Sequence, residues 1–174
     1  MVKRTSKTQR LIEVVRRHGH PISLKIRLGA NTYQKSVKVY LNCLRETAAD
    51  LYVVEAKTAA QESREEYDYS VFPECVDAAA GKQVIANGGI DSPETVKELQ
   101  ETGVSGVMIG RAALGNPAIF DQIKTRLGLP SKPVPVIEDL RAEYTELHKL
   151  YAGDEAHINN LQRTMGRPVA SAHY

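Results

Sequence analysis

Two short apolar segments of this sequence each end in glycine, and a helix-like segment separates them. The first runs into Asn87-Gly88-Gly89 and the second into Gly110-Arg111. Glycine lets a backbone approach a ligand closely and adopt dihedral angles that a Cβ forbids. N–H groups exposed in this way can point at an anion, and the N-terminus of a following helix favours negative charge. Arg111 adds a planar guanidinium suited to phosphate oxygens. The pattern indicates a phosphate site; two ordinary tight turns are the alternative.

A second candidate group lies on the strand-like segment "ISLKIRL", from Ile22 to Leu28. Its apolar residues alternate with Ser23, Lys25 and Arg27, so the latter share one face of a strand. If the apolar face packs on helices, both cations face the axis of the fold. Buried cations are costly without an anionic or polar partner, which favours a ligand there. In the alternative, the alternation is reversed and both cations lie at a wet strand end.

Glu55 and Lys57 end the next strand-like segment and are two residues apart, which places them on the same face. They are predicted to form a simple ion pair, or Glu55 accepts hydrogen bonds from a ligand. Together with Arg27 they are candidates for the substrate side of the site.

These residues are positioned by alternating strands and helices. Strands are expected at residues 22–28, 51–56, 84–87 and 104–109. Helices are expected at 8–18, 33–49 and 71–80, after the Asp91-Ser92-Pro93 start signal, and from Leu114 or Pro117. Such alternation with short connections is typical of a parallel sheet in an α/β fold.

Four βα units amount to half of an eight-stranded barrel. A full (β/α)8 barrel needs roughly 200 to 250 residues, and this chain has 174. We therefore predict a partial (β/α)8 TIM barrel in residues 1–129 and a linker with a helical C-terminal element in 130–174. In the latter, residues 138–151 and 155–165 have helical patterns and 166–174 form a frayed end.

Composition excludes several classes of protein. No apolar run approaches the about 18 residues of a membrane span, and no signal peptide is apparent, so a cytoplasmic location is expected. Cys43 and Cys75 are far apart, without metal-ligand spacing, so we expect two buried structural cysteines and no metal site. Residues 1–25 carry seven Lys/Arg against one acid. This stretch is suited to an RNA backbone or is simply a solvated helix face.

Three motifs together resemble the tRNA-dihydrouridine synthase family: "LKIRLG" (24–29), "VIANGGI" (84–90) and "GVMIGRAALGNPAIF" (106–120). The similarity runs from about residue 21 to 120, and more loosely into the helical tail. It implies a flavin barrel that holds FMN and reduces uridine in tRNA to 5,6-dihydrouridine, with NADPH or NADH as the reductant. By position, the resemblance assigns the following residues to cofactor binding: Lys25 at the flavin ring, and Asn87, Gly88, Gly89, Gly110 and Arg111 at the phosphate.

The sequence also departs from this family. The usual "VHGRT" is here "VEAKT", so Glu55 replaces a histidine and Lys57 an arginine. The resemblance covers strands five to eight, whereas the family's catalytic cysteine belongs to the first half of the barrel. Neither Cys43 nor Cys75 matches it, and the catalytic residue is unknown. The chain is therefore expected to be a fragment, a truncated gene product, or a half that pairs with a second chain or copy.

Two further interpretations of the function stay open. In one, the chain is a catalytically incomplete half-barrel that binds flavin or phosphate. In the other, it is another phosphate-binding TIM-barrel enzyme, such as a dihydroorotate dehydrogenase-like protein. Such enzymes share the site made by two loops, but the "GRAALGNPAIF" extension (110–120) fits them less well.

Overall fold

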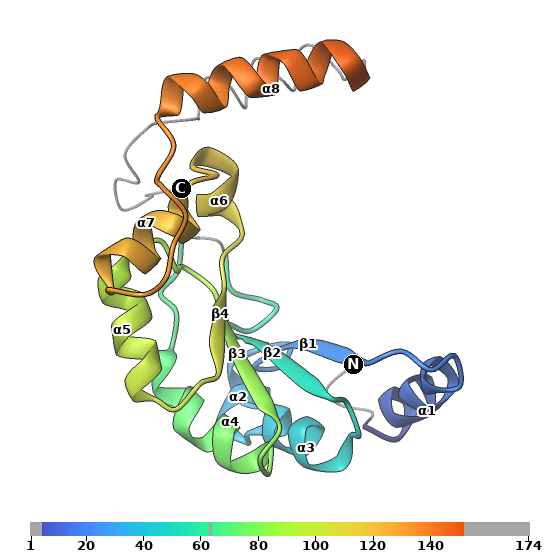
Figure 1. Ribbon diagram of the computed structural model, residues 1–174. Helices are drawn as coiled ribbons and strands as arrows, with labels where there is room; N and C mark the ends of the chain where they lie inside the picture. The colour runs from blue at the N-terminus through green and yellow to red at the C-terminus, as the bar shows by residue number, and fades with distance from the viewer. Residues whose placement is uncertain (1–4, 63, 152–174) are drawn as a thin grey trace. The chain divides into compact units, whose positions relative to one another are not determined.

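The computed structural model describes residues 5–62 and 64–151 (Figure 1). The strands are β1 (Ser23–Arg27), β2 (Leu51–Glu55), β3 (Gln83–Asn87) and β4 (Gly106–Met108). The helices are α1 (Thr5–Arg16), α2 (Thr32–Ser36), α3 (Val39–Glu46), α4 (Phe72–Ala78), α5 (Pro93–Glu101), α6 (Arg111–Gly115), α7 (Ile119–Arg126) and α8 (Ile137–Tyr151), with a 3-10 turn, η1 (Tyr69–Val71). All four expected strands are present.

The described residues form two compact units. The first holds all four strands and comprises residues up to 90 together with 95–108. The second comprises 91–94 and the residues from 109 onward, including α6, α7 and α8. The division at residue 129 that the sequence suggested stays a prediction.

The four strands form one parallel sheet in the order β1-β2-β3-β4. Each strand is hydrogen-bonded to the next one in the sequence, as in a (β/α)8 barrel, in which helices separate successive parallel strands. The predicted class, an α/β fold that forms part of such a barrel, is confirmed.

One face of the sheet is largely buried in its centre. Its side chains are at most 4% exposed: Ile26, Tyr52, Val54, Val84 and Ala86. Helix α4 packs against β3 and against α3, and α3 also contacts α1. The apolar residues of β1 are therefore on the helix-covered side, and Lys25 and Arg27 are on the other, as the period-two pattern predicted.

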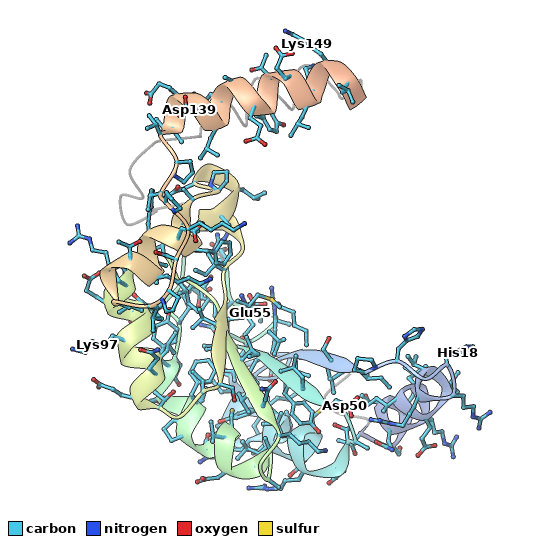
Figure 2. The ribbon with its side chains drawn as sticks, in the orientation of Figure 1. His18, Asp50, Glu55, Lys97, Asp139 and Lys149 are labelled. Carbon is cyan, nitrogen blue, oxygen red and sulfur yellow. The ribbon has the colours of Figure 1, made fainter. Side chains whose placement is uncertain are left out.

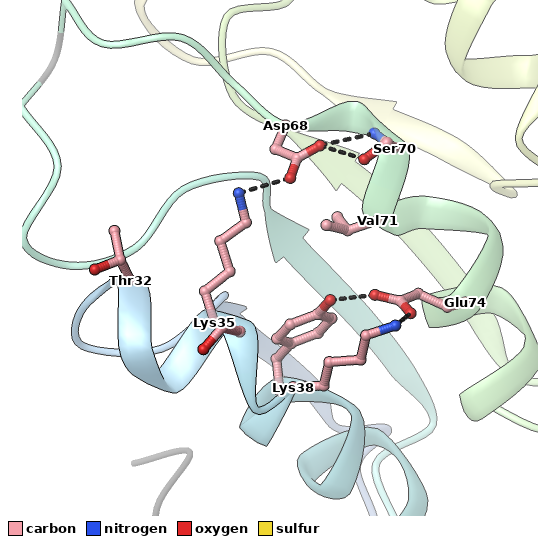
Figure 3. Close-up of a pocket in the computed structure, with 9 residues that line it drawn as sticks. Thr32, Lys35, Lys38, Asp68, Ser70, Val71 and Glu74 are labelled. Atoms are coloured by element: carbon pink, nitrogen blue, oxygen red, sulfur yellow. Dashed lines mark hydrogen bonds and ion pairs between the residues drawn. The ribbon is translucent and has the colours of Figure 1, made fainter.

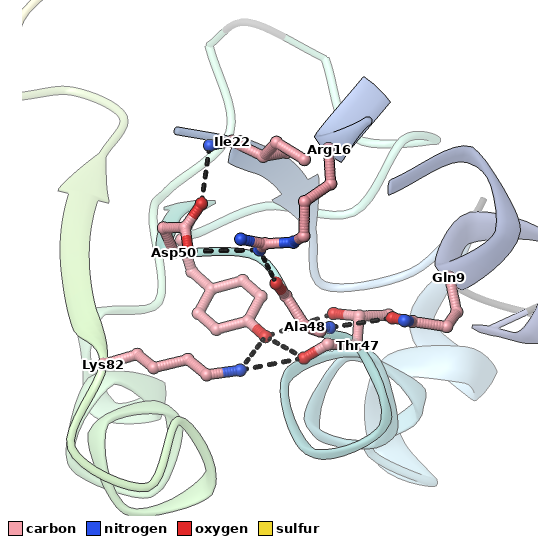
Figure 4. A network of polar contacts seen from close by, with 8 residues as sticks. Gln9, Arg16, Ile22, Thr47, Ala48, Asp50 and Lys82 are labelled. Atoms are coloured by element: carbon pink, nitrogen blue, oxygen red, sulfur yellow. Dashed lines mark hydrogen bonds and ion pairs between the residues drawn. The ribbon is translucent and has the colours of Figure 1, made fainter. Parts of the chain in front are cut away.

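A polar network joins α1 to the sheet at the start of β2 (Figure 4). Arg16 donates to a carboxylate oxygen of Asp50 over 3.1 Å and also to the carbonyl of Ala48. The Asp50 carboxylate accepts the Ile22 N–H at 2.7 Å, and Gln9 accepts the Ala48 N–H at 2.8 Å. Arg16 is thus part of a structural network, which favours the solvated-helix interpretation over RNA contact for this member of the basic N-terminal stretch.

The continuous helix predicted for residues 33–49 is wrong. Lys38 has φ 54° and ψ 39°, a left-handed conformation that ends α2 and lets α3 begin at the next residue. The reason is tertiary: the Lys38 ammonium pairs with Glu74 of α4, and the Tyr40 hydroxyl donates to the same carboxylate (Figure 3). Apolar periodicity alone does not report this contact.

The later elements match the sequence more closely. α5 begins at Pro93, as the capping signal predicted, and α8 covers the helix expected at 138–151. The helix expected from Leu114 or Pro117 is instead two helices, because α6 already begins at Arg111 and α7 follows at Ile119. The predictions for 155–165 and 166–174 lie outside the described residues.

Candidate cofactor and phosphate site

Three charged side chains meet on the open face of the sheet. Glu55 at the end of β2 is in register with Arg27 of β1. One carboxylate oxygen of Glu55 accepts from Lys25 Nζ at 2.9 Å and from Arg27 Nε at 3.1 Å. The carboxylate side chain is only 15% exposed, whereas the two cations are 47% and 44% exposed (Figure 2 labels Glu55). The partners of Glu55 are therefore the two cations of the neighbouring strand.

This cluster has a net positive charge. Burial raises the pKa of Glu55, but the Lys25 hydrogen bond and the charges of Lys25 and Arg27 outweigh burial and hold this pKa below its ordinary value. Glu55 is thus ionised at neutral pH, and two cations share one carboxylate. One positive charge is therefore left over on Lys25 and Arg27, which are both about half exposed. An anionic ligand such as a phosphate or a reduced flavin can pair with it.

Asn87 extends the cluster across the sheet. The register places Arg27, Glu55 and Asn87 side by side on β1, β2 and β3, near the carboxyl ends of the strands. The Asn87 amide donates to the carbonyl of Met108 on β4 at 2.8 Å. Ligands of parallel α/β sheets bind at this end of the strands. The fold thus brings together four of the predicted site residues: Lys25, Arg27, Glu55 and Asn87.

The glycine turn after β3 lies under an aromatic side chain. Gly88 and Gly89 have φ of 115° and 64°, which favour glycine. A Cβ on Gly88 would lie 2.4 Å from the ring of Tyr67, and one on Gly89 2.6 Å from it. Tyr69 donates to the Gly88 carbonyl at 2.7 Å. These glycines are therefore needed for packing within the protein as well as for any ligand.

Lys57 lies in a different environment from Lys25 and Arg27. It is 3% exposed, and its ammonium donates to the carbonyl of Glu62 at 3.0 Å. The same nitrogen is 3.9 Å from the centroid of the Tyr67 ring. Sequence reasoning did not identify Tyr67 or Tyr69. The available signal was the pair of aromatic residues in the otherwise acidic segment "EEYDY" at 65–69.

Gly110 and Arg111 belong to the second unit. Gly110 precedes the first residue of α6, and a Cβ built on it would have no heavy atom within 4 Å. Space for a close approach therefore exists at this glycine. The pair follows β4 after a single residue, Ile109, as the phosphate hypothesis requires.

Neither cysteine is suited to acid or nucleophilic chemistry in this conformation. Both are 0% exposed, which confirms the expected burial. Burial raises the pKa of Cys43, and burial together with Glu74 raises that of Cys75 to about 12. Within residues 5–62 and 64–151 there is no group of His, Cys, Asp and Glu that could hold a metal ion.

A surface pocket of about 500 Å³ lies elsewhere in the first unit, between α2, α3 and the η1–α4 segment (Figure 3). Its cations are already engaged: Lys35 pairs with Asp68 at 2.6 Å, and Lys38 pairs with Glu74. None of the predicted site residues lines this pocket. The part of the chain that the structure describes also has no helix long and apolar enough to cross a membrane.

The parallel βα sheet, with its strands in sequential order, defines part of an α/β barrel with a polar row at the carboxyl end of its strands. The family model described as Dihydrouridine synthase (Dus) matches residues 2–169. The chain belongs to this family.

Comparison with individual proteins agrees. The chain is 31% identical to "tRNA-dihydrouridine synthase B" of Pseudomonas aeruginosa over 164 residues, which are 91% of this chain and 49% of the relative. It is 33% identical to the protein of the same name from Vibrio cholerae, over 75% of this chain and 42% of the relative. A human protein, "tRNA-dihydrouridine(47) synthase [NAD(P)(+)]-like", is 33% identical over 60% of this chain and 16% of its own length. The chain spans about half the length of the bacterial relatives.

A solved structure of the RcsB response regulator of Salmonella typhimurium matches with a TM-score of 0.38 and 8% identity, covering 87% of this chain and 96% of that one.

Proposed function

We propose that this chain supplies the phosphate side and part of the flavin side of an FMN-dependent tRNA-dihydrouridine synthase. The reaction is the reduction of uridine in tRNA to 5,6-dihydrouridine, with NADPH or NADH as the source of hydride. The observation that carries the proposal is the row of Arg27, Glu55 and Asn87 at the carboxyl end of the sheet, with Lys25 bound to the same carboxylate. Membership of the dihydrouridine synthase family supports it.

The net positive charge of the Lys25, Arg27 and Glu55 cluster suits the anionic FMN. When bound, FMN supplies the hydride chemistry, while the protein supplies placement and charge. Lys25 is assigned to the flavin ring, where a cation stabilises the negative charge of the reduced form. Asn87, Gly88 and Gly89 are assigned to one phosphate loop. Gly110 and Arg111 are assigned to the other on their sequence position after β4.

Arg27 and Glu55 are proposed to lie on the substrate side. Glu55 introduces a negative charge, but the two cations bound to it leave the cluster positive. We therefore expect Glu55 to keep the Lys25 and Arg27 side chains in place. Flavin affinity that is unchanged in Glu55→Gln, although it is reduced in Lys25→Met, would contradict this expectation.

The test of the proposed function is flavin retention. The purified chain is incubated with FMN, passed through gel filtration and measured by visible absorption, next to Lys25→Met and the surface control Lys97→Met. We expect a flavin band in the wild type and in Lys97→Met, and a weaker one in Lys25→Met. If the folded chain, together with any partner that it needs, binds no flavin, the proposal is wrong.

Activity is a separate question from binding. If the chain binds FMN but forms no dihydrouridine in tRNA, alone or with a second half, the incomplete half-barrel is the correct interpretation. Tight binding of a bare sugar phosphate in preference to FMN would favour another phosphate-binding barrel. Family membership speaks against this last interpretation.

We further propose that a second chain or copy completes the barrel. Parallel sheets are usually covered on both faces, yet Lys25, Arg27 and Met108 are exposed here. Helix α1 also has an exposed apolar stripe, with Leu11 and Val14 52% and Val15 48% exposed. Light scattering of the purified chain tests this: a stable monomer that neither self-associates nor binds the first half of a family barrel contradicts it.

We propose tRNA as a binding partner because the relatives are named as tRNA-dihydrouridine synthases and because residues 1–25 are basic. Phosphate contacts release counterions, so affinity for tRNA is expected to fall steeply with salt concentration. A binding constant that does not change with salt would contradict direct contact with the RNA backbone. The cytoplasmic location expected from the sequence stays a prediction.

A further inference from the structure

The segment between β2 and η1 folds back over the glycine turn that follows β3. The Asp68 N–H donates to the carbonyl of Ala56 at 3.0 Å, and the Ala56 N–H donates to the carbonyl of Asn87 at 3.0 Å. The Tyr69 hydroxyl then reaches the Gly88 carbonyl at 2.7 Å. The first residue of η1, directly after this segment, is thus hydrogen-bonded to the turn proposed to hold phosphate.

The ring of Tyr67 also lies beside this turn. It lies against Gly88 and Gly89, since a Cβ on either residue would be less than 3 Å from a ring carbon. The ring is also stacked with that of Tyr69, with centroids 6.3 Å apart and an angle of 17° between the planes. A displacement of Tyr67 would therefore remove the side chain that packs against both glycines and leave the turn with more freedom to move.

Lys57 is placed where it can hold Tyr67. Its ammonium is 3.9 Å from the ring centroid, and the residue is 3% exposed. A cation over an aromatic face is attracted by the ring quadrupole, and more strongly where water is excluded. The same ammonium donates a hydrogen bond of 3.0 Å to the carbonyl of Glu62, five residues later in the loop, which also holds it in place. A buried ammonium stays charged only with such partners.

We propose that Lys57 is a positioning residue for the glycine turn and acts on it through Tyr67. Lys57 holds the ring, the ring holds the backbone of Gly88 and Gly89, and this backbone presents its N–H groups to an anion. In this role Lys57 does not contact tRNA, whereas the sequence pattern had made it a candidate for the substrate side of the site. The part of this inference that concerns phosphate rests on the proposed function.

The first arm of the test compares two ligands that differ only in the phosphate, FMN and riboflavin. The variants are Lys57→Met, which keeps most of the length of the side chain but not the charge, and Lys57→Arg, which keeps the cation. Lys97→Met, on the exposed side of α5, is the matched control. Lys57→Met is expected to lower the preference for FMN over riboflavin about tenfold, the order of a desolvated cation–π contact. Lys57→Arg should restore most of it, and the control should not change it.

A purely structural role of Lys57 would give a different result. The melting temperature would fall and both ligands would lose affinity by the same factor, so their ratio would stay constant. A constant ratio in Lys57→Met overturns the proposal. So does a Lys57→Arg variant that behaves like Lys57→Met.

The second arm needs no ligand and separates this inference from the proposed function. Hydrogen exchange of the peptide containing residues 88–90 is measured in the wild type, Lys57→Met, Tyr67→Leu and Lys97→Met. Faster exchange at this turn in Lys57→Met and Tyr67→Leu, but not in Lys97→Met, is expected. If exchange is unchanged, Lys57 does not position the turn, whether or not the chain binds flavin. If the wild type binds no flavin but the turn loosens as expected, only the proposed function fails.

Discussion

Substitution of Gly89 by alanine should cost more stability than the same substitution at Gly81, although both glycines have positive φ. Gly89 has φ 64° and Gly81 has φ 85°, so alanine meets a similar left-handed backbone at each. That term is roughly 1–2 kcal/mol. At Gly81 a Cβ has no heavy atom within 4 Å, whereas at Gly89 it lies 2.6 Å from Cδ2 and 2.7 Å from Cε2 of Tyr67.

The steric term follows from these distances. Carbon atoms prefer about 3.5–4.0 Å, so the Tyr67 ring or the turn must move by roughly 1 Å. Overpacking of this kind typically costs about 1–3 kcal/mol. Gly81→Ala is therefore expected to lower the free energy of unfolding by about 1–2 kcal/mol, and Gly89→Ala by about 2–5 kcal/mol. Urea denaturation followed by circular dichroism measures both.

A double-mutant cycle assigns the difference to Tyr67. In a Tyr67→Ala background the two ring contacts are gone and only the Tyr69 hydroxyl, 3.2 Å from the added methyl, remains close, so most of the extra cost of Gly89→Ala over Gly81→Ala should disappear. The coupling free energy between positions 67 and 89 should be about 1–3 kcal/mol. If Gly89→Ala and Gly81→Ala cost the same in the wild-type background, the Tyr67 ring does not lie against the turn and the reasoning fails.

Three further outcomes follow from burial and charge. The pKa of Glu55 is lowered in the folded chain. Its contribution to stability should therefore be present above the pKa of an unfolded glutamate, about 4.3, and be lost as the pH falls through the folded pKa. Glu55→Gln should remove this acid dependence from the urea midpoints measured between neutral and acidic pH. Equal acid sensitivity of the two proteins would contradict the ion cluster. Leu99→Ala, at a fully buried position of α5, should cost about 2–5 kcal/mol in urea denaturation, while Lys97→Ala on the exposed side should stay within about 0.5 kcal/mol. Cys43 and Cys75 should react with a maleimide only when the chain unfolds, because both are buried and the pKa of each thiol is raised. Labelling is read by mass spectrometry. Fast labelling of the native chain would show that α3 or α4, which carry the two cysteines, opens.

The elements of the sheet were predictable because their signals are local. In β1, period-two alternation separates Leu24 and Ile26 from Lys25 and Arg27, and burial follows that pattern. The start of α5 at Pro93 is likewise determined by a capping side chain and a proline next to each other in the sequence. Such signals depend on neighbours within one strand or one turn of helix.

Tertiary contacts decided what local signals do not contain. Lys38 breaks a helix-like pattern because its partner, Glu74, is on another helix. Glu55 is bound by Lys25 and Arg27 because the parallel register aligns β1 with β2.

The glycine turn after β3 likewise combines a local sequence signal with a tertiary contact. The sequence by itself indicated that the backbone at Gly88 and Gly89 can be approached closely and can adopt dihedral angles that a Cβ forbids. Only the tertiary structure showed that Tyr67, from a loop some 20 residues earlier, lies against them, with Lys57 beside its ring. The physical reason is that contacts between distant segments depend on how strands pair and where loops cross the sheet, whereas backbone preferences are properties of neighbouring residues.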